Sequence, residues 1–347
     1  MRRLGRAVAG AALTATLVAG CSGAPEAGAE QAGGPTLYVP TWLEPEQYQA
    51  IAGLPLADEH ANVVLAFAVP EDEQLPTPEI PQGVVDVVGR LAADAHVSLA
   101  IGGYGTDETH QPILDGFEAQ SYDPEAFAAR IGQAADRVAD QIGRPVDGID
   151  MDWEYPEVSQ AERFGALLGS LDRLYPDRRL SVAVPASDNT EGFFAAIGDI
   201  AQHADVVHVM TYDENTPYGD GGAGPVASRD WMLRSFEAWQ QRLSEAGGSA
   251  KAAIGFPGYC YTYQSAQAEG DSFTAGTSSP YRSIDASALQ PMADGSHGLA
   301  DADGWTSCFT PDDVRAVMAA LPEGRVPVFA WSAEGLDDDY FAALSGR

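Results

Sequence analysis

The chain has 347 residues, 45% of them hydrophobic, and this is enough to bury a large core without outside help. It carries 51 acidic and 19 basic residues, so its formal net charge is −32. A protein this acidic is repelled by nucleic acid and by anionic surfaces. We therefore expect no nucleic-acid partner.

The first 20 residues have the composition of a processing segment rather than of a folded domain. Three arginines precede an apolar stretch, 7–18, that is too short to span a bilayer comfortably. This stretch leads into Val18-Ala19-Gly20-Cys21, which resembles a bacterial lipoprotein box and implies cleavage before Cys21 and a lipid on it. An ordinary secretory signal with an incidental Cys is the alternative.

Residues 22–35 are rich in Gly, Ala, Pro and Glu and have no apolar periodicity, which is typical of a flexible tether. We therefore expect a signal peptide over 1–20, a lipidated Cys21 with its tether over 21–35, and one folded domain over 36–347. The protein is then exported and held at the cell surface as a monomer. It would contact the membrane only through the lipid on Cys21.

Eight short β-like runs alternate with helix-like stretches over the rest of the chain. Most of the runs are continuously apolar, as strands buried on both faces should be. The expected strands cover residues 36–39, 62–69, 96–101, 147–153, 180–184, 206–212, 252–256 and 326–331. The clearest expected helices cover residues 124–142, 160–175, 231–246 and 311–321.

Two of these helices have recognisable start signals. Asp123-Pro124 and Thr310-Pro311 each place a capping residue before a Pro at the first helical position. Eight alternations of strand and helix predict an α/β fold, a single-domain (β/α)8 TIM barrel. A doubly wound open sheet is the alternative, but it usually brings a Gly-rich phosphate loop, and none follows an early strand.

Cys260 and Cys308 remain once Cys21 is assigned to the lipid. In an exported, oxidising setting we expect a disulfide between them, with two unrelated free thiols as the alternative. The stretch 261–307, rich in Ser, Gly, Asp and Ala, then becomes a disulfide-pinned loop between the seventh and eighth strands. Neither these Cys nor the 6 His residues show metal-ligand spacing, so we expect no metal and no other cofactor. His208, inside an apolar run, is expected to be a buried barrel residue.

The segment 147–156, Asp-Gly-Ile-Asp-Met-Asp-Trp-Glu-Tyr-Pro, is the most informative part of the chain. Asp150, Asp152 and Glu154 stand at i, i+2 and i+4, so on an extended strand they point to one side, ~7 Å apart pairwise. Apolar residues alternate with them, which indicates a strand rather than a solvated acidic turn. Crowded acids lose hydration and repel one another, which raises the pKa of at least one carboxyl and suits a general acid.

Other polar and aromatic residues stand at the carboxyl ends of the expected strands, where barrels of this kind gather their active sites. Each residue alone is a weak signal, because a Tyr or Trp at a strand end is more often part of the core. Their coincidence on one rim predicts a binding cleft. The candidates for substrate binding are Trp331, Asp213, Met210, Tyr38, Phe67, Tyr155, Trp42 and Tyr259, with Tyr104 beside them.

The acidic segment resembles, nearly letter for letter, the DxxDxDxE signature of family 18 glycoside hydrolases, and its Trp-Glu-Tyr-Pro ending is most similar to the chitinases. Met210-Thr211-Tyr212-Asp213 resembles the sixth-strand motif of that family, and Gly255-Phe256-Pro257 with Tyr259 resembles the seventh-strand motif. Trp331 falls where the family has the Trp that floors the subsite of the scissile sugar. The resemblance covers most of residues 36–345.

The chain departs from the family pattern in two places. Ala100-Ile101-Gly102-Gly103 resembles a third-strand Ser-x-Gly-Gly motif with Ala100 in place of the Ser. In the family that Ser hydrogen-bonds the innermost Asp with a first-strand Tyr, for which Tyr38 is the candidate, so its loss should weaken the network by about 1–2 kcal/mol. Chitinases of the family often carry a small α+β insertion after the seventh strand, and 261–307 is too short and too poor in β-branched residues for the full insertion.

The resemblance implies a retaining hydrolase that cleaves β-1,4-linked N-acetylglucosamine polymers such as chitin by substrate-assisted catalysis. Glu154 would be the general acid and base, and Asp152 would orient and stabilise the acetamido group of the sugar. Asp150 would hold Asp152 in place and share its proton. Tyr212 would hydrogen-bond the acetamido carbonyl oxygen, and Asp213 would contact the distorted sugar.

Two other functions stay open. One is an endo-β-N-acetylglucosaminidase acting on glycoprotein glycans or peptidoglycan, whose signature usually departs from Trp-Glu-Tyr-Pro. The other is a non-catalytic, chitin-binding lectin on the same barrel. Lectins of this family commonly lack the Glu that matches Glu154 or another acid of the motif, whereas this chain has all three. The leading prediction is therefore a surface-anchored chitinase.

Overall fold

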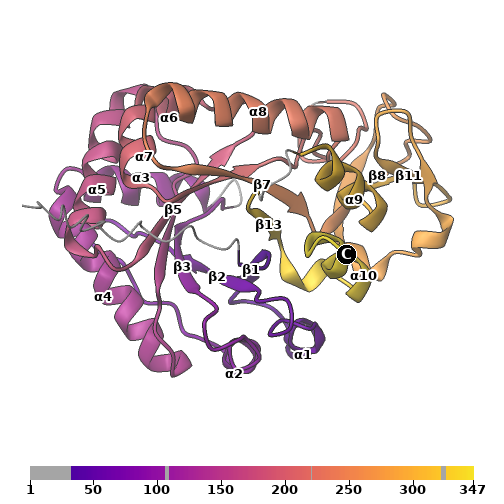
Figure 1. The fold of residues 1–347 in the computed structure, drawn as a ribbon. Coiled ribbons are helices and arrows are strands. Elements are labelled where there is room, and N and C mark those ends of the chain that lie inside the picture. The colour runs from indigo at the N-terminus through magenta and orange to yellow at the C-terminus, as the bar shows by residue number, and fades with distance from the viewer. Residues whose placement is uncertain (1–32, 106–108, 220, 322–325) are drawn as a thin grey trace, which may run out of the picture. The chain divides into compact units, whose positions relative to one another are not determined.

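Eight parallel strands close into a barrel in the computed structural model (Figure 1). The structure describes residues 33–105, 109–219, 221–321 and 326–347, and the predicted signal peptide and Cys21 lie outside these ranges, as does most of the tether. The barrel strands are β1 (Thr36–Pro40), β2 (Asn62–Ala68), β3 (Val97–Gly102), β4 (Gly148–Asp152), β5 (Arg179–Pro185), β6 (Val206–Met210), β7 (Lys251–Pro257) and β13 (Val328–Trp331). Around the barrel their order is β1, β13, β7, β6, β5, β4, β3, β2.

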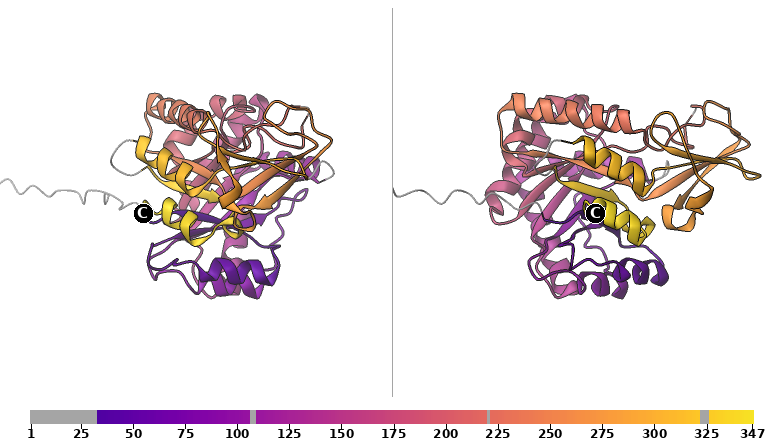
Figure 2. Two further views of the ribbon diagram at one scale, coloured as in Figure 1. Left: turned by 90° about the vertical axis from the view of Figure 1, so that its right-hand side faces the viewer. Right: turned by 45° about the vertical axis from the view of Figure 1, so that its right-hand side comes forward.

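Helices surround these strands and confirm the predicted (β/α)8 barrel (Figures 1 and 2). Each predicted strand, and each of the four predicted helices, is found with ends that differ by no more than two residues. The helices are α1 (Pro45–Gly53), α2 (Gln82–Val88), α3 (His110–Ser121), α4 (Pro124–Ile142), α5 (Ala161–Leu174), α6 (Glu191–Ala195), α7 (Ile197–His203), α8 (Arg229–Ala246), α9 (Pro311–Ala320) and α10 (Asp338–Leu344). Across the described ranges, no helix is both long and apolar enough to cross a membrane.

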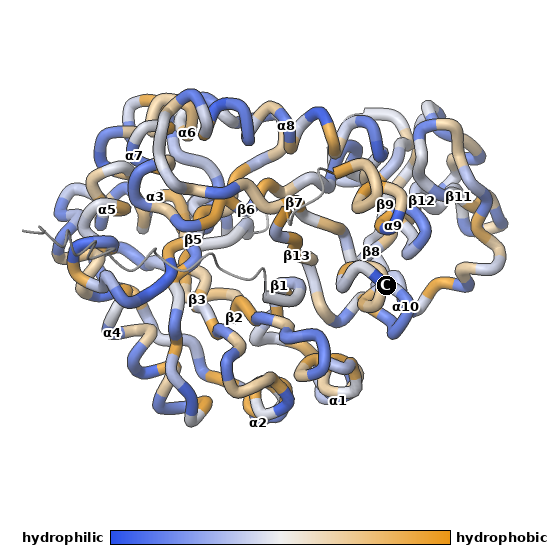
Figure 3. Tube along the Cα trace, in the orientation of Figure 1, coloured by the Kyte–Doolittle hydropathy of each residue, from blue (hydrophilic) through white to orange (hydrophobic). Residues whose placement is uncertain are grey.

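Helix α4 shows how local sequence fixes these elements. Its start is capped by Asp123, whose carboxylate accepts a hydrogen bond from the backbone N–H of Ala126 at 3.1 Å. Its end is set by Gly143, which adopts a left-handed φ of 68° that a glycine takes without steric penalty. Its apolar stripe packs against the barrel, so the hydrophobic side of the layer faces inward (Figure 3).

Trp153 fixes the direction in which the acids after β4 point. Its fully buried indole stacks on Phe117 of α3, with ring centroids 4.6 Å apart, and meets Phe164 of α5 edge-on at 5.9 Å. Alternate residues of an extended chain point to opposite sides. Because Trp153 packs outward into the helix layer, its neighbours Asp152 and Glu154 face the mouth of the barrel.

Residues 259–308, which follow β7, form an insertion that folds as a sheet, so the prediction of an irregular loop over 261–307 is wrong. Five antiparallel strands pair in the order β10, β11, β12, β8, β9, and Figure 2 shows them beside the barrel. Aromatic rings, rather than β-branched residues, stabilise this sheet. The centroid of the buried Tyr263 ring lies 5.7 Å from that of buried Trp305 and 5.0 Å from that of half-buried Phe273. The strands are β8 (Tyr259–Gln264), β9 (Ala275–Pro280), β10 (Gln290–Pro291), β11 (His297–Ala300) and β12 (Trp305–Cys308).

The predicted disulfide between Cys260 and Cys308 is present and lies within this sheet. The two residues stand directly opposite each other on β8 and β12, with Cα atoms 4.4 Å apart. The bond therefore joins the first and last strands of the insertion and closes it into one unit.

Replacing both Cys260 and Cys308 by Ser is expected to lower the free energy of unfolding by about 2–4 kcal/mol, because the bond restricts the unfolded chain over a separation of 48 residues. Urea unfolding of the two proteins, followed by circular dichroism, measures this difference. Reductant should destabilise the wild type by a similar amount and leave the double variant unchanged. Equal stability of wild type and variant would contradict the expectation.

Candidate active site

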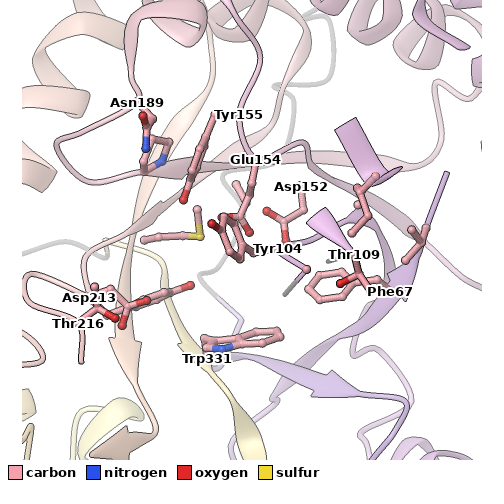
Figure 4. Close-up of a pocket in the computed structure, with 18 of the residues that line it drawn as sticks. Phe67, Tyr104, Thr109, Asp152, Glu154, Tyr155, Asn189, Asp213, Thr216 and Trp331 are labelled. Carbon is pink, nitrogen blue, oxygen red and sulfur yellow. The ribbon is translucent and has the colours of Figure 1, made fainter. Parts of the chain in front are cut away.

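A cleft of about 1450 Å³ opens at the carboxyl ends of the barrel strands. It brings together most of the residues that the sequence predicted (Figure 4). Asp150 lies deeper in the barrel, with a side chain that is 0% exposed. The predicted residues that line the cleft are Tyr38, Trp42, Phe67, Tyr104, Asp152, Glu154, Tyr155, Met210, Tyr212, Asp213 and Trp331.

Asp152 and Glu154 form a pair on one wall of this cleft. Both residues are buried, at 4% and 8% exposure, although their carboxyl groups reach the open space. Hydrogen bonding between the two side chains raises the pKa of Asp152 and lowers that of Glu154. The Oδ1 atom of Asp152 is buried and has no hydrogen-bond partner among the described residues.

Burial sets the proton affinity of both members of the pair. It raises the pKa of Asp152 well above its usual range, and the negative charges of Glu154 and Asp150 add to the rise. Burial also raises the pKa of Glu154 to about 7, against opposing hydrogen bonds from Tyr155 and Asp152. The charge of Asp213 adds to this rise. The pair therefore retains a proton near neutral pH, which is the property that a general acid needs.

The pKa of Asp150 is shifted down, in the opposite direction to the pKa values of Asp152 and Glu154. It accepts a hydrogen bond from the Tyr38 hydroxyl at 2.7 Å and another from the Ser181 hydroxyl, and its Oδ1 lies 3.1 Å from His208 Nδ1. Burial alone would raise its pKa, but the charge and hydrogen bond of His208, with the bonds from Ser181 and Tyr38, lower it. His208 is thus a buried barrel residue, as predicted, and it also contacts Asp150.

Aromatic rings form the opposite wall. The indole of Trp331 stacks with Phe67 at a centroid distance of 5.6 Å, and Phe67 stacks with Trp42 at 5.8 Å. In Figure 4 the Trp331 ring lies across the cleft from Asp152 and Glu154. Flat apolar faces of this kind are the surfaces on which pyranose rings stack.

The antiparallel sheet of strands β8 to β12 contributes a residue that the sequence analysis missed. Tyr261 of β8 lines the cleft, and its hydroxyl donates to Asp213 Oδ1 at 2.6 Å. Tyr259, which was predicted to bind substrate, also donates to Asp213, but it is not among the described residues that line the cleft. The alternation of tyrosines at 259, 261 and 263 was the available signal, because residues two apart on a strand share a face.

The cleft is lined by further acids, and the sequence analysis missed these as well. Glu71, Asp72, Asp115 and Asp188 line it in addition to the central acids. Among the described residues around the cleft there is no Lys or Arg. An anionic polymer would therefore be repelled, whereas a neutral or cationic one would not.

Comparison with known proteins places the chain in a family. The model for the family "Glycosyl hydrolases family 18" matches residues 36–310. A class V chitinase from Arabidopsis thaliana is 29% identical over 203 residues, which make up 54% of this chain and 51% of the plant protein. The match thus spans about half the length of that relative.

Solved structures share the fold at low sequence identity. A class V chitinase from Nicotiana tobaccum has a TM-score of 0.67 and 17% identity, with 90% of this chain and 99% of that chain covered. A mutant of it has been solved in complex with NAG4. The chitinase-like agglutinin RobpsCRA from Robinia pseudoacacia has a TM-score of 0.67 and 18% identity, with 89% and 98% covered. These likenesses carry the fold alone, but the family match extends over most of the sequence, and the chain belongs to glycosyl hydrolases family 18.

Proposed function

We propose that this protein is a chitinase-like hydrolase that cleaves β-1,4-linked N-acetylglucosamine polymers with retention of configuration. The observation that carries the proposal is the buried pair of Asp152 and Glu154, which lines the cleft across from Trp331. The chitinase names of the relatives and the sugar bound to the tobacco protein agree with it.

In the proposed first step, Glu154 donates its proton to the glycosidic oxygen. The acetamido carbonyl oxygen of the same sugar attacks C1 as the C1–O bond to the leaving sugar breaks, which gives a cyclic oxazolinium ion. Asp152, which lines the cleft, accepts the acetamido N–H and stabilises the positive charge as it develops. No second protein carboxylate acts as nucleophile.

In the second step, Glu154 acts as the base. It takes a proton from water, whose oxygen attacks C1 and opens the oxazolinium ion, so that configuration at C1 is inverted twice and retained overall. Tyr155 donates a hydrogen bond to Glu154 and holds it toward the bond that breaks. Tyr212 lines the same part of the cleft and would bind the acetamido carbonyl oxygen.

A lectin is the second candidate, because one structural neighbour is described as an agglutinin. Asp152 and Glu154 favour an enzyme, since sugar binding alone gains nothing from burying two carboxyl groups at raised pKa. Mass spectrometry of the products from N-acetylchitopentaose separates these functions. Shorter N-acetylated oligomers from the wild type, and none from Glu154→Gln, support the enzyme. A pentamer that is bound but not cleaved supports the lectin. A pentamer that is neither cleaved nor bound indicates that the ligand is another N-acetylated glycan.

Activity is expected to be lost as pH rises through about 7, because the pKa of Glu154 is raised to about 7 and the acid must be protonated for the first step. Below that pH the acid is present in its active form. Above it, kcat/KM should fall about tenfold for each pH unit. A profile of kcat/KM from pH 4 to 9 measures this limb. Full activity maintained at pH 9 would contradict the assignment of the acid.

We also propose that the chain is an exported lipoprotein held at the surface by a lipid on Cys21, because residues 18–21 match a lipoprotein box. Expression in a bacterium fed an alkyne-tagged fatty acid tests this. The wild type should take up the tag and sediment with membranes, whereas Cys21→Ser should do neither. A tagged Cys21→Ser protein would contradict the proposal.

A further inference from the structure

We propose that Ser181 and His208 are positioning residues that hold Asp150 as a carboxylate behind the Asp152–Glu154 pair. The inference rests on the proposed function, because it gives Asp150 a part in the same reaction. Neither Ser181 nor His208 is among the described residues that line the cleft. They therefore act on the substrate only through Asp150.

Strand register explains why Ser181 reaches Asp150. Asp150 on β4 pairs with Ala100 on β3 and with Ser181 on β5, so these three side chains point into the barrel at one level. Adjacent strands lie about 4.8 Å apart, a span that a Ser hydroxyl crosses to a carboxylate. The hydroxyl of Ser181 donates to Asp150 Oδ1. On the other side, Ala100 offers only a methyl group.

Three groups that can donate a hydrogen bond lie within reach of the Asp150 carboxyl group. Tyr38 has a single hydroxyl proton, and it gives this proton to Asp150 Oδ2 at 2.7 Å. The Tyr38 oxygen also lies 2.8 Å from His208 Nδ1, and that nitrogen carries the hydrogen when Tyr38 donates to an ionised Asp150. The same Nδ1 lies 3.1 Å from Asp150 Oδ1. Three donors therefore converge on Asp150, and all three are satisfied when it is ionised.

Packing keeps the imidazole in this position. The ring of His208 lies 4.7 Å from that of Phe329 and 5.8 Å from that of Tyr38, and the residue is 5% exposed. A buried carboxylate costs several kcal/mol unless hydrogen bonds and charges offset its lost hydration. Tyr38 cannot supply this alone, since it satisfies one of the two Asp150 oxygens. Ser181 and His208 satisfy the other.

An ionised Asp150 matters because its charge acts on the reacting pair. Its negative charge raises the pKa of Asp152, so the shared proton stays with Asp152 and Glu154. If the donors are removed, burial favours protonation of Asp150, and this aid to Asp152 is lost. The titratable groups that face Asp150 are Tyr38 from β1, Asp152 from β4 and His208 from β6, with Tyr212 near Tyr38.

The first test compares Ser181→Ala with the double variant Ala100→Ser/Ser181→Ala on N-acetylchitopentaose. Ser181→Ala should lower kcat about tenfold with KM unchanged, because a hydrogen bond to a charged group is lost away from the substrate. The double variant returns a hydroxyl to Asp150 from β3 and should recover most of the rate. Ser170→Ala removes a buried hydroxyl on α5 that donates to the Ala166 carbonyl, and it should leave kcat unchanged.

The pH profile separates this role from simple packing. Loss of a donor raises the pKa of Asp150, so the acid limb of kcat should move up by about one pH unit in Ser181→Ala and return in the double variant. His208→Phe keeps a ring against Phe329 and removes the donor, and it should move the limb in the same direction. Unchanged kcat and acid limb in Ser181→Ala would overturn the proposal, as would a loss that the second hydroxyl does not recover.

A measurement independent of turnover distinguishes this proposal from the proposed function. Asp carboxyl carbons are titrated by ¹³C NMR in wild type and Ser181→Ala, with Asp150→Asn to assign the signal. Asp150 should titrate at higher pH in the variant. If the wild type leaves the pentamer intact, the proposed function fails, and this titration still decides whether Ser181 holds Asp150 ionised. Equal titration in both proteins would overturn the proposal.

Discussion

Replacing Glu154 by Gln is expected to lower kcat for N-acetylchitopentaose by about 10²–10⁴-fold, because the glycosidic oxygen then leaves without a proton. The amide keeps the size of the carboxyl group and keeps an oxygen toward Tyr155, so the shape of the cleft is preserved. Initial rates measured by chromatography of the products give the ratio of the two proteins.

Sugar binding should survive this substitution, and that outcome distinguishes an acid from a residue that merely shapes the cleft. Isothermal titration calorimetry with the pentamer should give a dissociation constant within a few-fold of the wild-type value. Glu162→Gln, the same chemical change at an exposed position of α5, is the matched control and should have wild-type rates. A Glu154→Gln protein that turns over at a tenth of the wild-type rate or faster would contradict the assignment.

A pentamer of glucosamine is expected to be cleaved about 10⁵-fold more slowly than N-acetylchitopentaose, or not at all. Without the acetamido group the reaction loses its nucleophile, and an intramolecular attack of this kind is worth an effective concentration of about 10⁵ M or more. Electrostatic repulsion cannot explain such a result, because Glu71, Asp72, Asp115 and Asp188 line the cleft and attract a cationic sugar.

The measurement is product formation from each pentamer under the same conditions, followed to long times by mass spectrometry. A glucosamine pentamer with one acetylated unit is the control, since it should be cut only where that unit occupies the site of Asp152. Comparable rates for the fully acetylated and fully deacetylated sugars would contradict the mechanism. They would require a protein nucleophile in place of the acetamido oxygen.

The barrel could be predicted because its signals are local. Buried parallel strands are continuous apolar runs, and helix ends carry their own caps, as Asp123 and Gly143 do for α4. The antiparallel insertion could not be predicted in this way. Its strands hold Ser, Gly and Ala, and they are stabilised by a disulfide and by aromatic packing between residues distant in sequence, such as Tyr263 and Trp305.

The acids of the site could also be predicted, because Asp150, Asp152 and Glu154 are close in sequence. The residues that support them could not. Ser181 and His208 lie 31 and 58 positions from Asp150, and their contacts depend on the register of β5 and β6, which the sequence does not reveal. The weakening of the network that Ala100 predicts therefore did not take account of the Ser181 hydroxyl, which comes from the neighbouring strand on the other side of β4.

If the substrate's own acetamido group attacks C1 while Glu154 donates a proton, the configuration of the first product is set by that mechanism. Proton NMR during the first minutes of N-acetylchitopentaose hydrolysis resolves the two anomers of each new reducing end before they equilibrate. Two inversions at C1 predict that the β anomer forms first. Formation of the α anomer first, or a pentamer that remains intact, would contradict the account.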